Sequence, residues 1–206
     1  MSHAENLGSS AYTVSSGTSP DPTGLFRSWL NAALAARPQA HAMGLATATP
    51  DGRPSLRTVM LQAYGAAGFV FLTERDTVKA RQLAANPHAA LLFFWPEANR
   101  QIRIDGTARR LSSASLAWSR FSPLTGADEL TWISSEGLIA DSRQAMAALM
   151  TGVCGFIVDP GSVRFWQGGQ DRQHAVVEYT RAAEGWARRI SGPPDLRHAI
   201  GIEADS

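Results

Sequence analysis

The first strong pattern along the chain is a stripe of apolar residues that recur every three or four positions. It consists of Leu25, Phe26, Trp29, Leu30, Ala33 and Leu34. This spacing is typical of an amphipathic α-helix that buries one face. Asp21-Pro22-Thr23 supplies a start signal for the helix, and Arg37-Pro38 supplies a stop. The sequence therefore predicts one helix at the beginning of the ordered chain.

From His41 onward the pattern changes to short extended segments separated by turn signals such as Pro50-Asp51-Gly52. Within residues 55–63, Arg57 and Leu61 share one face and Thr58 shares the other with Gln62, because side chains alternate along a strand. We predict strands at 42–49, 55–63, 69–73, 88–95, 101–111, 155–158, 163–167, 175–180 and 186–190.

Three further segments are predicted to be helical: 77–85, capped by Asp76 or Thr77, then 112–121 and 140–150. Many short antiparallel strands with a few helices are typical of a small barrel with the helices outside it. We expect a mainly β fold with helices (α+β) in one domain. The expected organisation is a flexible N-terminal leader over 1–20, the domain over 21–190 and a C-terminal tail over 191–206.

Composition narrows the function classes. The chain has 206 residues and a formal net charge of +1, so no basic excess points to nucleic acid or to an anionic membrane. Cys154 is the only cysteine and the five histidines are scattered, which argues against a structural metal site. No segment approaches the roughly 20 apolar residues that span a bilayer. We expect a cytoplasmic protein that contacts no membrane.

The segment Thr73–Lys79 is the first candidate for chemistry. A strand ends in a hydroxyl residue, a turn follows, and a helix then begins with a lysine near its first turn. Helix N-termini present unpaired N–H groups and the positive end of a dipole, which suits a phosphate. Arg57 could reach the same place with a bidentate guanidinium. Units of this kind also occur without any ligand, so the pattern alone leaves both readings open.

The run Phe165–His174 is the second candidate. Gly168-Gly169 permits a tight turn or a close approach of the backbone. Arg172 could stabilise negative charge, and His174 could donate or accept a proton near neutral pH. A plain hairpin loop with exposed polar residues is the alternative.

Taken together, these pieces resemble the pyridoxamine 5'-phosphate oxidase family in order and spacing over about residues 21–190. The motifs that carry the resemblance are Asp21-Pro22, Arg57–Leu61, Gly68–Thr73, Lys79-Ala80, Asn86-Pro87, Leu91–Trp95, Arg100-Gln101, Gly106, Arg110–Ser112 and Phe165–Gly169. The resemblance implies a split β-barrel that binds flavin mononucleotide (FMN) and forms a homodimer with two FMN sites at the interface. It also implies transfer of a hydride from a small-molecule substrate to flavin N5, with reoxidation by oxygen.

The resemblance also implies roles for individual residues. Arg57, Thr73 and Lys79 match residues that hold the FMN phosphate, and Gln101 and Trp166 match residues that contact the flavin. Arg172 and His174 match the substrate-side catalytic pair. The remaining expected cofactor contacts are Thr58, Val59, Met60, Leu61, Gln62, Leu72 and Thr77.

Several positions depart from the family's pattern. Gln62 stands where the family has Lys, and Val78 and Val176 stand where it has cofactor-binding Arg. The Gln-Ser cofactor pair falls near Ser135 and Glu136, and the Tyr, Arg and Ser that grip the substrate phosphate fall near Ser119, Pro123 and Ala127. Because each charge-assisted contact contributes about 1.5–3 kcal/mol, these losses predict weaker binding of a phosphorylated substrate.

Three functions follow as hypotheses. The first is an FMN-dependent oxidase of another small molecule, an amine or a dihydro-aromatic compound in specialised biosynthesis, as in the related phenazine-pathway oxidases. The second is a pyridoxamine/pyridoxine 5'-phosphate oxidase with an altered phosphate site, in which Arg120 substitutes for a missing cation. The third is a non-catalytic flavin or ligand carrier.

Overall fold

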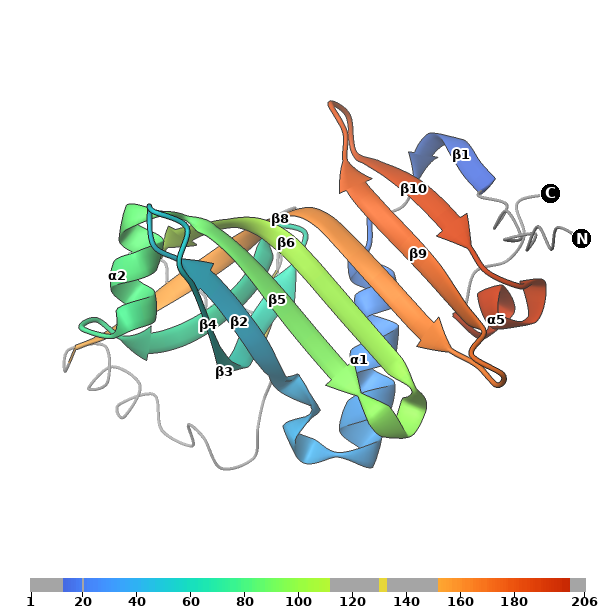
Figure 1. The fold of residues 1–206 in the computed structure, drawn as a ribbon, viewed down its shortest axis with the longest axis horizontal. Coiled ribbons are helices and arrows are strands. Elements are labelled where there is room, and N and C mark those ends of the chain that lie inside the picture. The colour runs from blue at the N-terminus through green and yellow to red at the C-terminus, as the bar shows by residue number, and fades with distance from the viewer. Residues whose placement is uncertain (1–12, 20, 112–129, 133–151, 201–206) are drawn as a thin grey trace, which may run out of the picture.

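The computed structural model describes residues 13–19, 21–111, 130–132 and 152–200 (Figure 1). Its helical elements are α1 (Thr23–Ala36), η1 (Pro38–His41), α2 (Val78–Ala85), η2 (Pro96–Ala98) and α5 (Pro194–Ala199). Its strands are β1 (Thr13–Ser19), β2 (Ala42–Ala48), β3 (Pro54–Gly65), β4 (Gly68–Glu74), β5 (His88–Trp95), β6 (Arg100–Arg110), β7 (Leu130–Trp132), β8 (Val153–Gly168), β9 (His174–Arg181) and β10 (Trp186–Ser191).

Six of these strands close into a barrel. The order β8-β4-β3-β2-β5-β6 returns to its start, because β6 also pairs with β8. Beyond the barrel, the same antiparallel sheet continues from β8 into β9, β10 and β1. The fold is therefore mainly β with few helices, and it is the split barrel that the family resemblance implies.

Strand β8 connects the two parts. Val153–Val158 pairs with β4 and Ser162–Gly168 pairs with β9, while the stretch between Phe156 and Gln167 pairs with β6. The sequence analysis predicts two separate strands here, 155–158 and 163–167. The structure shows that this prediction is wrong: a β-bulge absorbs the extra residue and the strand continues.

The core lies inside the barrel and under α1. Phe26 of α1 is fully buried and contacts Tyr64, Phe69 and Phe93 edge to face, with ring centroids 4.9, 4.9 and 5.2 Å away. Strand β5, at the residues 88–95 predicted as a strand, alternates buried and outward residues along its whole length. Cys154 is buried in the same cluster, as expected for a small apolar side chain.

The ends of the chain differ from expectation. Strand β1 pairs with β10 within the segment expected to be a flexible leader, and α5 forms within the segment expected to be a weakly patterned tail. Ile200, just after α5, is 1% exposed and belongs to the core. The division of the chain at residues 20 and 190 stays a prediction. The helices expected at 112–121 and 140–150 lie outside the described residues, as do Ser119, Arg120, Pro123, Ala127, Ser135 and Glu136.

The bulge gives a test of how tightly β6 and β8 pack. Asp105 pairs with Ser162 and Gly106 with Pro160, so Gly161 is the extra residue. A Cβ at Gly106 would collide with the carbonyl oxygen of Asp159, whereas a Cβ at Gly161 would meet only the Asp105 oxygen, at 3.7 Å. We expect Gly106→Ala to lower the free energy of unfolding by about 1–3 kcal/mol, as overpacking does.

Gly161→Ala is the matched control and should stay within about 0.5 kcal/mol of the parent. Urea unfolding at a fixed protein concentration measures both variants. Equal unfolding midpoints for the two would show that the bulge does not constrain Gly106.

Candidate active site

The turn from β4 into α2 forms one end of the candidate site. Thr77 is the N-cap of α2, and its hydroxyl accepts a hydrogen bond from the Ala80 N–H at 3.4 Å. The same hydroxyl donates to the Glu74 carbonyl at 3.0 Å and lies 3.3 Å from the Thr73 hydroxyl. The two threonines expected at a phosphate site are thus in contact at a helix N-terminus.

Positive charge gathers around this turn. Thr73 pairs with Cys154 across β4 and β8. Burial raises the pKa of the Cys154 thiol, while the positive charges of Arg110, Arg75 and Lys79 act in the opposite direction. Three cations therefore lie near the Thr73 end of the barrel. Val78, where the family has arginine, is exposed and supplies none, so Arg75 and Arg110 are the additional cations that the sequence analysis missed.

Arg57 reaches α2 from β3. Its guanidinium donates to the Leu45 carbonyl at 3.0 Å and to the Thr47 hydroxyl at 2.6 Å. It also lies 3.4 Å from Oε1 of Gln82 on α2, and burial lowers its pKa. Arg57 thus joins β2, β3 and α2 in one network, on the helix whose N-terminus carries Thr77 and Lys79. No hydrogen bond or ion pair in the described part of the chain joins Arg57 to Thr73 or Lys79 directly.

The other residues of β3 and β4 that were predicted to contact the cofactor fall into two groups, some on the core side of the sheet and some on its outer side. Val59 and Leu61 point into the core, at 7% and 0% exposure, so only their backbones are available to a ligand. Thr58 is exposed, and Met60 and Gln62 are half-buried on the outer face of the sheet. Leu72, on β4, is also half-buried.

A second group of predicted residues lies on the outer face of the sheet. Antiparallel register places Phe94, Gln101, Trp166, Val176 and Ser191 in one row across β5, β6, β8, β9 and β10. Paired residues of neighbouring antiparallel strands point to the same side. Gln101 and Trp166, which the resemblance assigns to the flavin, are therefore neighbours.

Contacts of the neighbouring residues Gln167, Gly168 and His174 hold Trp166 in position. Nε2 of Gln167 donates to the Ala98 and Asn99 carbonyls at 3.1 and 3.3 Å, which fastens the end of β8 to the β5–β6 connection. A Cβ at Gly168 would clash with the Asn99 side chain and lie 2.6 Å from Cη2 of Trp166. The glycine therefore makes room for the indole ring. Trp166 also stacks on His174, with ring centroids 6.0 Å apart and an interplanar angle of 27°.

The β8–β9 connection carries the predicted catalytic pair. Asp171 and Arg172 both have left-handed backbones, at φ 53° and 61°, and the Gln173 N–H donates to the Gln170 carbonyl at 3.0 Å. These values are typical of a type I′ hairpin turn. The sequence analysis allowed either a tight turn or a close backbone approach at Gly168-Gly169. Asp171 and Arg172 make the turn, whereas the glycines permit close approach, to Trp166 at Gly168 and to Leu196 at Gly169. Non-glycine residues in this region of backbone space are strained and concentrate at functional sites.

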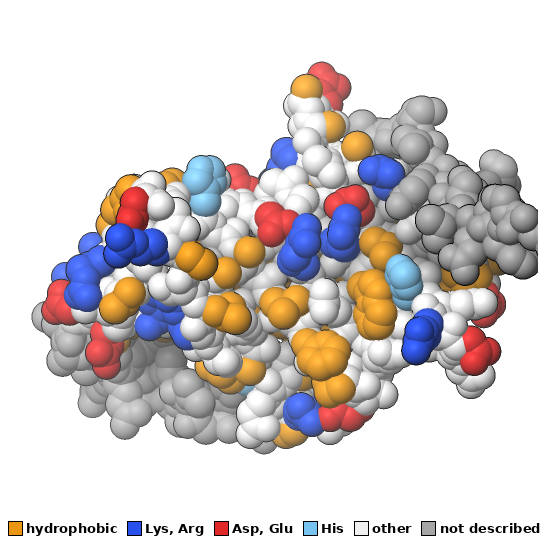
Figure 2. Space-filling model, viewed as in Figure 1, with side chains coloured by type: hydrophobic (Ala, Val, Ile, Leu, Met, Phe, Trp, Pro, Cys, Tyr) orange, Lys and Arg blue, Asp and Glu red, His pale blue; other side chains and the backbone are white. Residues whose placement is uncertain are grey.

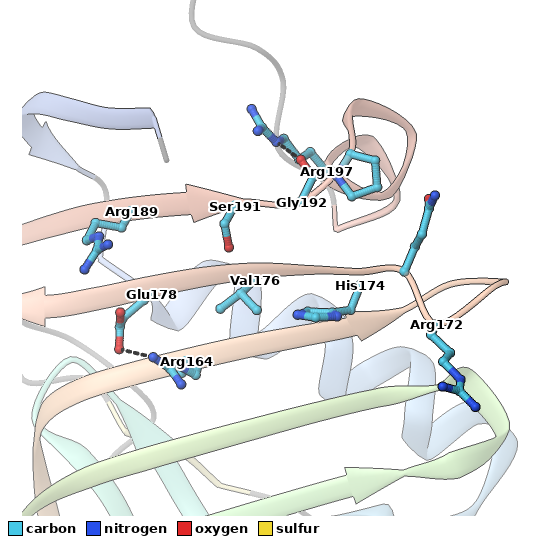
Figure 3. A pocket seen from close by; sticks show the side chains of 11 residues that line it. Arg164, Arg172, His174, Val176, Glu178, Arg189, Ser191, Gly192 and Arg197 are labelled. Atoms are coloured by element: carbon cyan, nitrogen blue, oxygen red, sulfur yellow. Dashed lines mark hydrogen bonds and ion pairs between the residues drawn. The ribbon is translucent and has the colours of Figure 1, made fainter. Parts of the chain in front are cut away.

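Arg172 and His174 line one groove on the outer face of β8, β9 and β10 (Figure 3). The groove has a volume of about 720 Å³. His174 lies along the sheet toward Val176, whereas Arg172 projects from the hairpin tip away from His174 (Figure 3). The two residues are thus close in the chain and share a groove, but their side chains diverge.

The groove also contains residues to which the sequence analysis assigned no functional role: Arg164, Glu178, Arg189, Ser191 and Arg197. Arg164 donates to Glu178 at 3.0 Å across β8 and β9. The sequence does contain a pattern that could have pointed to these residues. Charged residues alternate with buried ones along these strands, as where Arg164 lies between Val163 and Phe165. Sequence alone does not show that three strands and a helix present them to one space.

The two groups of site residues lie at opposite ends of the molecule. Cys154, beside Thr73, and Trp166 are both on β8, twelve positions apart. At about 3.3 Å per residue, this separation corresponds to roughly 40 Å of strand. Figure 1 shows the same separation, with α2 at one end and the β8–β9 hairpin with α5 at the other. Within one chain, β8 therefore holds the two groups of predicted site residues apart.

Two further observations concern other kinds of site. Within the described ranges, no three His, Cys, Asp or Glu side chains form a group that could hold a metal ion. None of the described helices combines the length and the apolar composition needed to cross a membrane.

Comparison with known proteins gives the context for this geometry. Residues 30–167 match the family model for pyridoxamine 5'-phosphate oxidase, and residues 154–191 match the model for the pyridoxine 5'-phosphate oxidase C-terminal dimerisation region. Curated pyridoxine/pyridoxamine 5'-phosphate oxidases include one from Sphingopyxis alaskensis, 39% identical over 82% of this chain and 86% of the relative. Another, from Rubrobacter xylanophilus, is 39% identical over 84% of this chain and 87% of the relative.

Solved structures agree in fold. PhzG from Burkholderia lata, in complex with tetrahydrophenazine-1-carboxylic acid, is 25% identical with a TM-score of 0.64, over 84% of this chain and 93% of that one. A pyridoxamine 5'-phosphate oxidase-related FMN-binding protein from Nostoc punctiforme is 20% identical with a TM-score of 0.60, over 85% of this chain and 100% of that one, and it supports the fold alone.

These matches cover most of the chain, including both ends of the candidate site. They favour an enzyme over the non-catalytic carrier of the third hypothesis. The dimerisation region, which includes Trp166, Arg172 and His174, suggests a homodimer. This chain belongs to the pyridoxamine 5'-phosphate oxidase family and is a flavin-dependent oxidase of that type.

Proposed function

We propose that the protein is a pyridoxamine/pyridoxine 5'-phosphate oxidase that uses FMN and works as a homodimer, with each FMN site formed by both subunits. The observation that carries the dimeric site is the separation along β8: the phosphate-type residues near Thr73 and the flavin-type residues near Trp166 are held apart within one chain. The 39% identity to curated oxidases of this specificity favours the second hypothesis of the sequence analysis over the first.

The residues present fit FMN. Thr73, Thr77 and Lys79 at the start of α2, with Arg57 attached to the same helix, supply hydroxyls, N–H groups and positive charge for a phosphate dianion. Gln101 and Trp166 of the other subunit supply a half-buried polar group and an aromatic surface for the flavin ring. FMN, when bound, accepts the hydride that the substrate loses.

The chain's own residues then orient the substrate. His174 is held against Trp166 at one end of the groove, where it can exchange a proton with the amine or hydroxyl of the substrate. Arg172, on the strained hairpin tip, supplies a cation at the rim. The catalytic assignment of these two residues remains a proposal.

The outer face of the sheet is also suited to a partner copy. Leu56, Leu92 and Phe94 are exposed at 74%, 38% and 56%. Figure 2 shows hydrophobic side chains gathered in the middle of this face, beside basic and acidic ones. Exposed apolar patches with polar borders are typical of protein interfaces.

A second candidate is oxidation of a dihydro-aromatic acid. The structural similarity to PhzG bound to tetrahydrophenazine-1-carboxylic acid favours it, as does the replacement of the family's phosphate-gripping Tyr, Arg and Ser near Ser119, Pro123 and Ala127.

A substrate assay decides between the candidates. We expect the purified protein loaded with FMN to convert pyridoxamine 5'-phosphate, oxygen and water to the aldehyde, with one ammonia and one hydrogen peroxide formed per aldehyde. Unphosphorylated pyridoxamine is the control and should turn over at least about tenfold less efficiently, since one charge-assisted contact contributes about 1.5–3 kcal/mol. Turnover of a dihydrophenazine carboxylate, with no aldehyde from pyridoxamine phosphate, would contradict the proposal and favour the second candidate.

The phosphate site has its own test. We expect Lys79→Ala to weaken FMN binding by roughly 10- to 100-fold, because it removes one charge-assisted contact to a dianion. Arg81→Ala on the same helix is the matched control. Arg81 is exposed and donates to the Asp76 carbonyl, so its loss should change FMN affinity little. Fluorescence quenching of added FMN measures both variants, and equal losses would argue against a specific phosphate site at Lys79.

Mixing two defective variants tests whether the sites are shared. Lys79→Ala and Trp166→Ala should each bind FMN poorly as homodimers. In a mixed dimer one site carries both defects and the other carries none. Random reassociation of equal amounts should restore about a quarter of the parent's flavin binding and activity, because half of the dimers are mixed. No recovery after confirmed subunit exchange would show that each site lies within one chain.

A further inference from the structure

The groove on the outer face of β8, β9 and β10 is walled by a segment that lies beyond the family match. The dimerisation-region match ends at residue 191, and Pro193 and Arg197, which line the groove, follow it. A volume of about 720 Å³ is within the range of small-molecule sites.

Contacts fix this segment in place. A Cβ at Gly169 would lie 2.7 Å from Cδ1 of Leu196, so α5 packs directly on the β8–β9 connection. Nε of Arg197 donates to the Gly192 carbonyl at 2.6 Å. Nε1 of Trp29 on α1 donates to the Ile200 carbonyl at 3.4 Å. The segment 192–200 is therefore packed against the rest of the domain and forms one side of the groove, which we call the wall.

The wall passes close to the proposed catalytic histidine. Gly192 has a left-handed backbone at φ 107°. A Cβ there would lie 2.5 Å from both the Ala175 Cα and the His174 carbonyl oxygen. Only glycine fits this conformation and this approach, so the chain turns directly beside the start of β9 and the groove begins at His174.

The lining carries an excess of positive charge. Among the described residues that line the groove, four are arginines (Arg164, Arg172, Arg189 and Arg197) and one, Glu178, is a carboxylate. The formal charge of the whole chain is only +1, so this excess is local. Glu178 pairs with Arg164 at 3.0 Å, and Nε of Arg164 is buried with no hydrogen-bond partner among the described residues. A hollow lined by one sign of charge concentrates the field that attracts an opposite charge.

The register defines the order of groups along the groove. Val176 and Ser191 form the row next to His174, and Glu178 and Arg189 form the row beyond. Rows on one face are two residues apart, or about 7 Å. Figure 3 shows His174, then Val176 and Ser191, then Arg189 and Glu178, in this sequence. A planar ring at the Trp166–His174 stack would hold a substituent near Ser191 and Arg189.

We propose that this end of the groove is a subsite for an anionic substituent, phosphate or carboxylate, on a heteroaromatic ligand. Arg189 and Ser191 are the specificity-determining residues, and Arg197 is a positioning residue that ties the wall to Gly192. The inference deepens the proposed function, on which it rests, by assigning the charge of the substrate to residues of β10.

Equilibrium binding to the FMN-loaded protein tests the subsite with two matched pairs of probes. Pyridoxal 5'-phosphate is compared with pyridoxal, and phenazine-1-carboxylate with phenazine. We expect the anionic member of at least one pair to bind about tenfold more tightly or better. The pair with the larger ratio identifies phosphate or carboxylate as the group recognised. Arg189→Gln should remove most of that ratio and leave the affinity for the neutral member unchanged.

Arg53→Gln is the control for net charge, because its side chain is 84% exposed and lies outside the groove. It should leave the ratio unchanged. Leu196→Ala should weaken both members of a pair alike, since it loosens the wall without removing charge. An unchanged ratio in Arg189→Gln with FMN bound overturns the proposal. So does a shift of Arg189→Gln from dimer to monomer, because the groove would then be a subunit contact.

The result is independent of turnover. A protein that binds the anionic probes through Arg189 but does not oxidise pyridoxamine 5'-phosphate would contradict the proposed function and support the subsite. A protein that oxidises this compound but binds the anionic probes without any dependence on Arg189 would support the proposed function and contradict the subsite.

Discussion

Because β8 pairs with β4 at one end, with β9 at the other and with β6 between them, it sets the geometry of the whole molecule. The pairing with β6 closes the barrel, and the continuation beyond the barrel supports the layer that carries Trp166 and His174. The bulge at Gly106 and Gly161 allows both, since it bends the strand without ending it. The same continuity holds the two halves of the candidate site apart. The dimeric site that we propose is thus a consequence of strand length.

Charge in this protein is organised locally. Positive charge gathers in two places: around the Thr73 turn, where Arg75, Lys79 and Arg110 lie near Cys154, and in the groove with Arg189. Both sit beside backbone N–H groups or hydroxyls that an anion can use. At the Thr73 turn, Arg75 and Arg110 offer positive charge near the position where Val78 replaces the family's arginine. Loss of one cationic position therefore does not remove the electrostatic character of the site.

The C-terminal segment 192–200 changes the shape of the outer face of β8, β9 and β10. Without it, the face of β8, β9 and β10 would be an open sheet surface. With α5 packed on Gly169 and Gly192 turned against His174, the face becomes a groove with a wall. A few residues beyond the family match can thus shape the space next to the proposed catalytic residues, which is how members of one fold family come to differ in ligand.

The amino-acid sequence was enough to predict the fold class and the positions of α1, α2 and most strands. Through the family resemblance it also suggested which residues belong to the proposed phosphate and flavin ends. These features follow from local periodicity, from capping at Thr77 and from short motifs such as Phe165–Gly169. The prediction of two separate strands around residues 159–161 was wrong. Pairing with β6 on both sides of this segment carries a single strand, β8, across a bulge. Which residues far apart in the sequence lie side by side follows only from the tertiary structure. Register across β6, β8, β9 and β10 gathered Gln101, Trp166, Arg189 and Ser191, and the length of β8 separated them from Thr73. No local pattern encodes that distance, because it depends on which strands pair and how far each pairing runs.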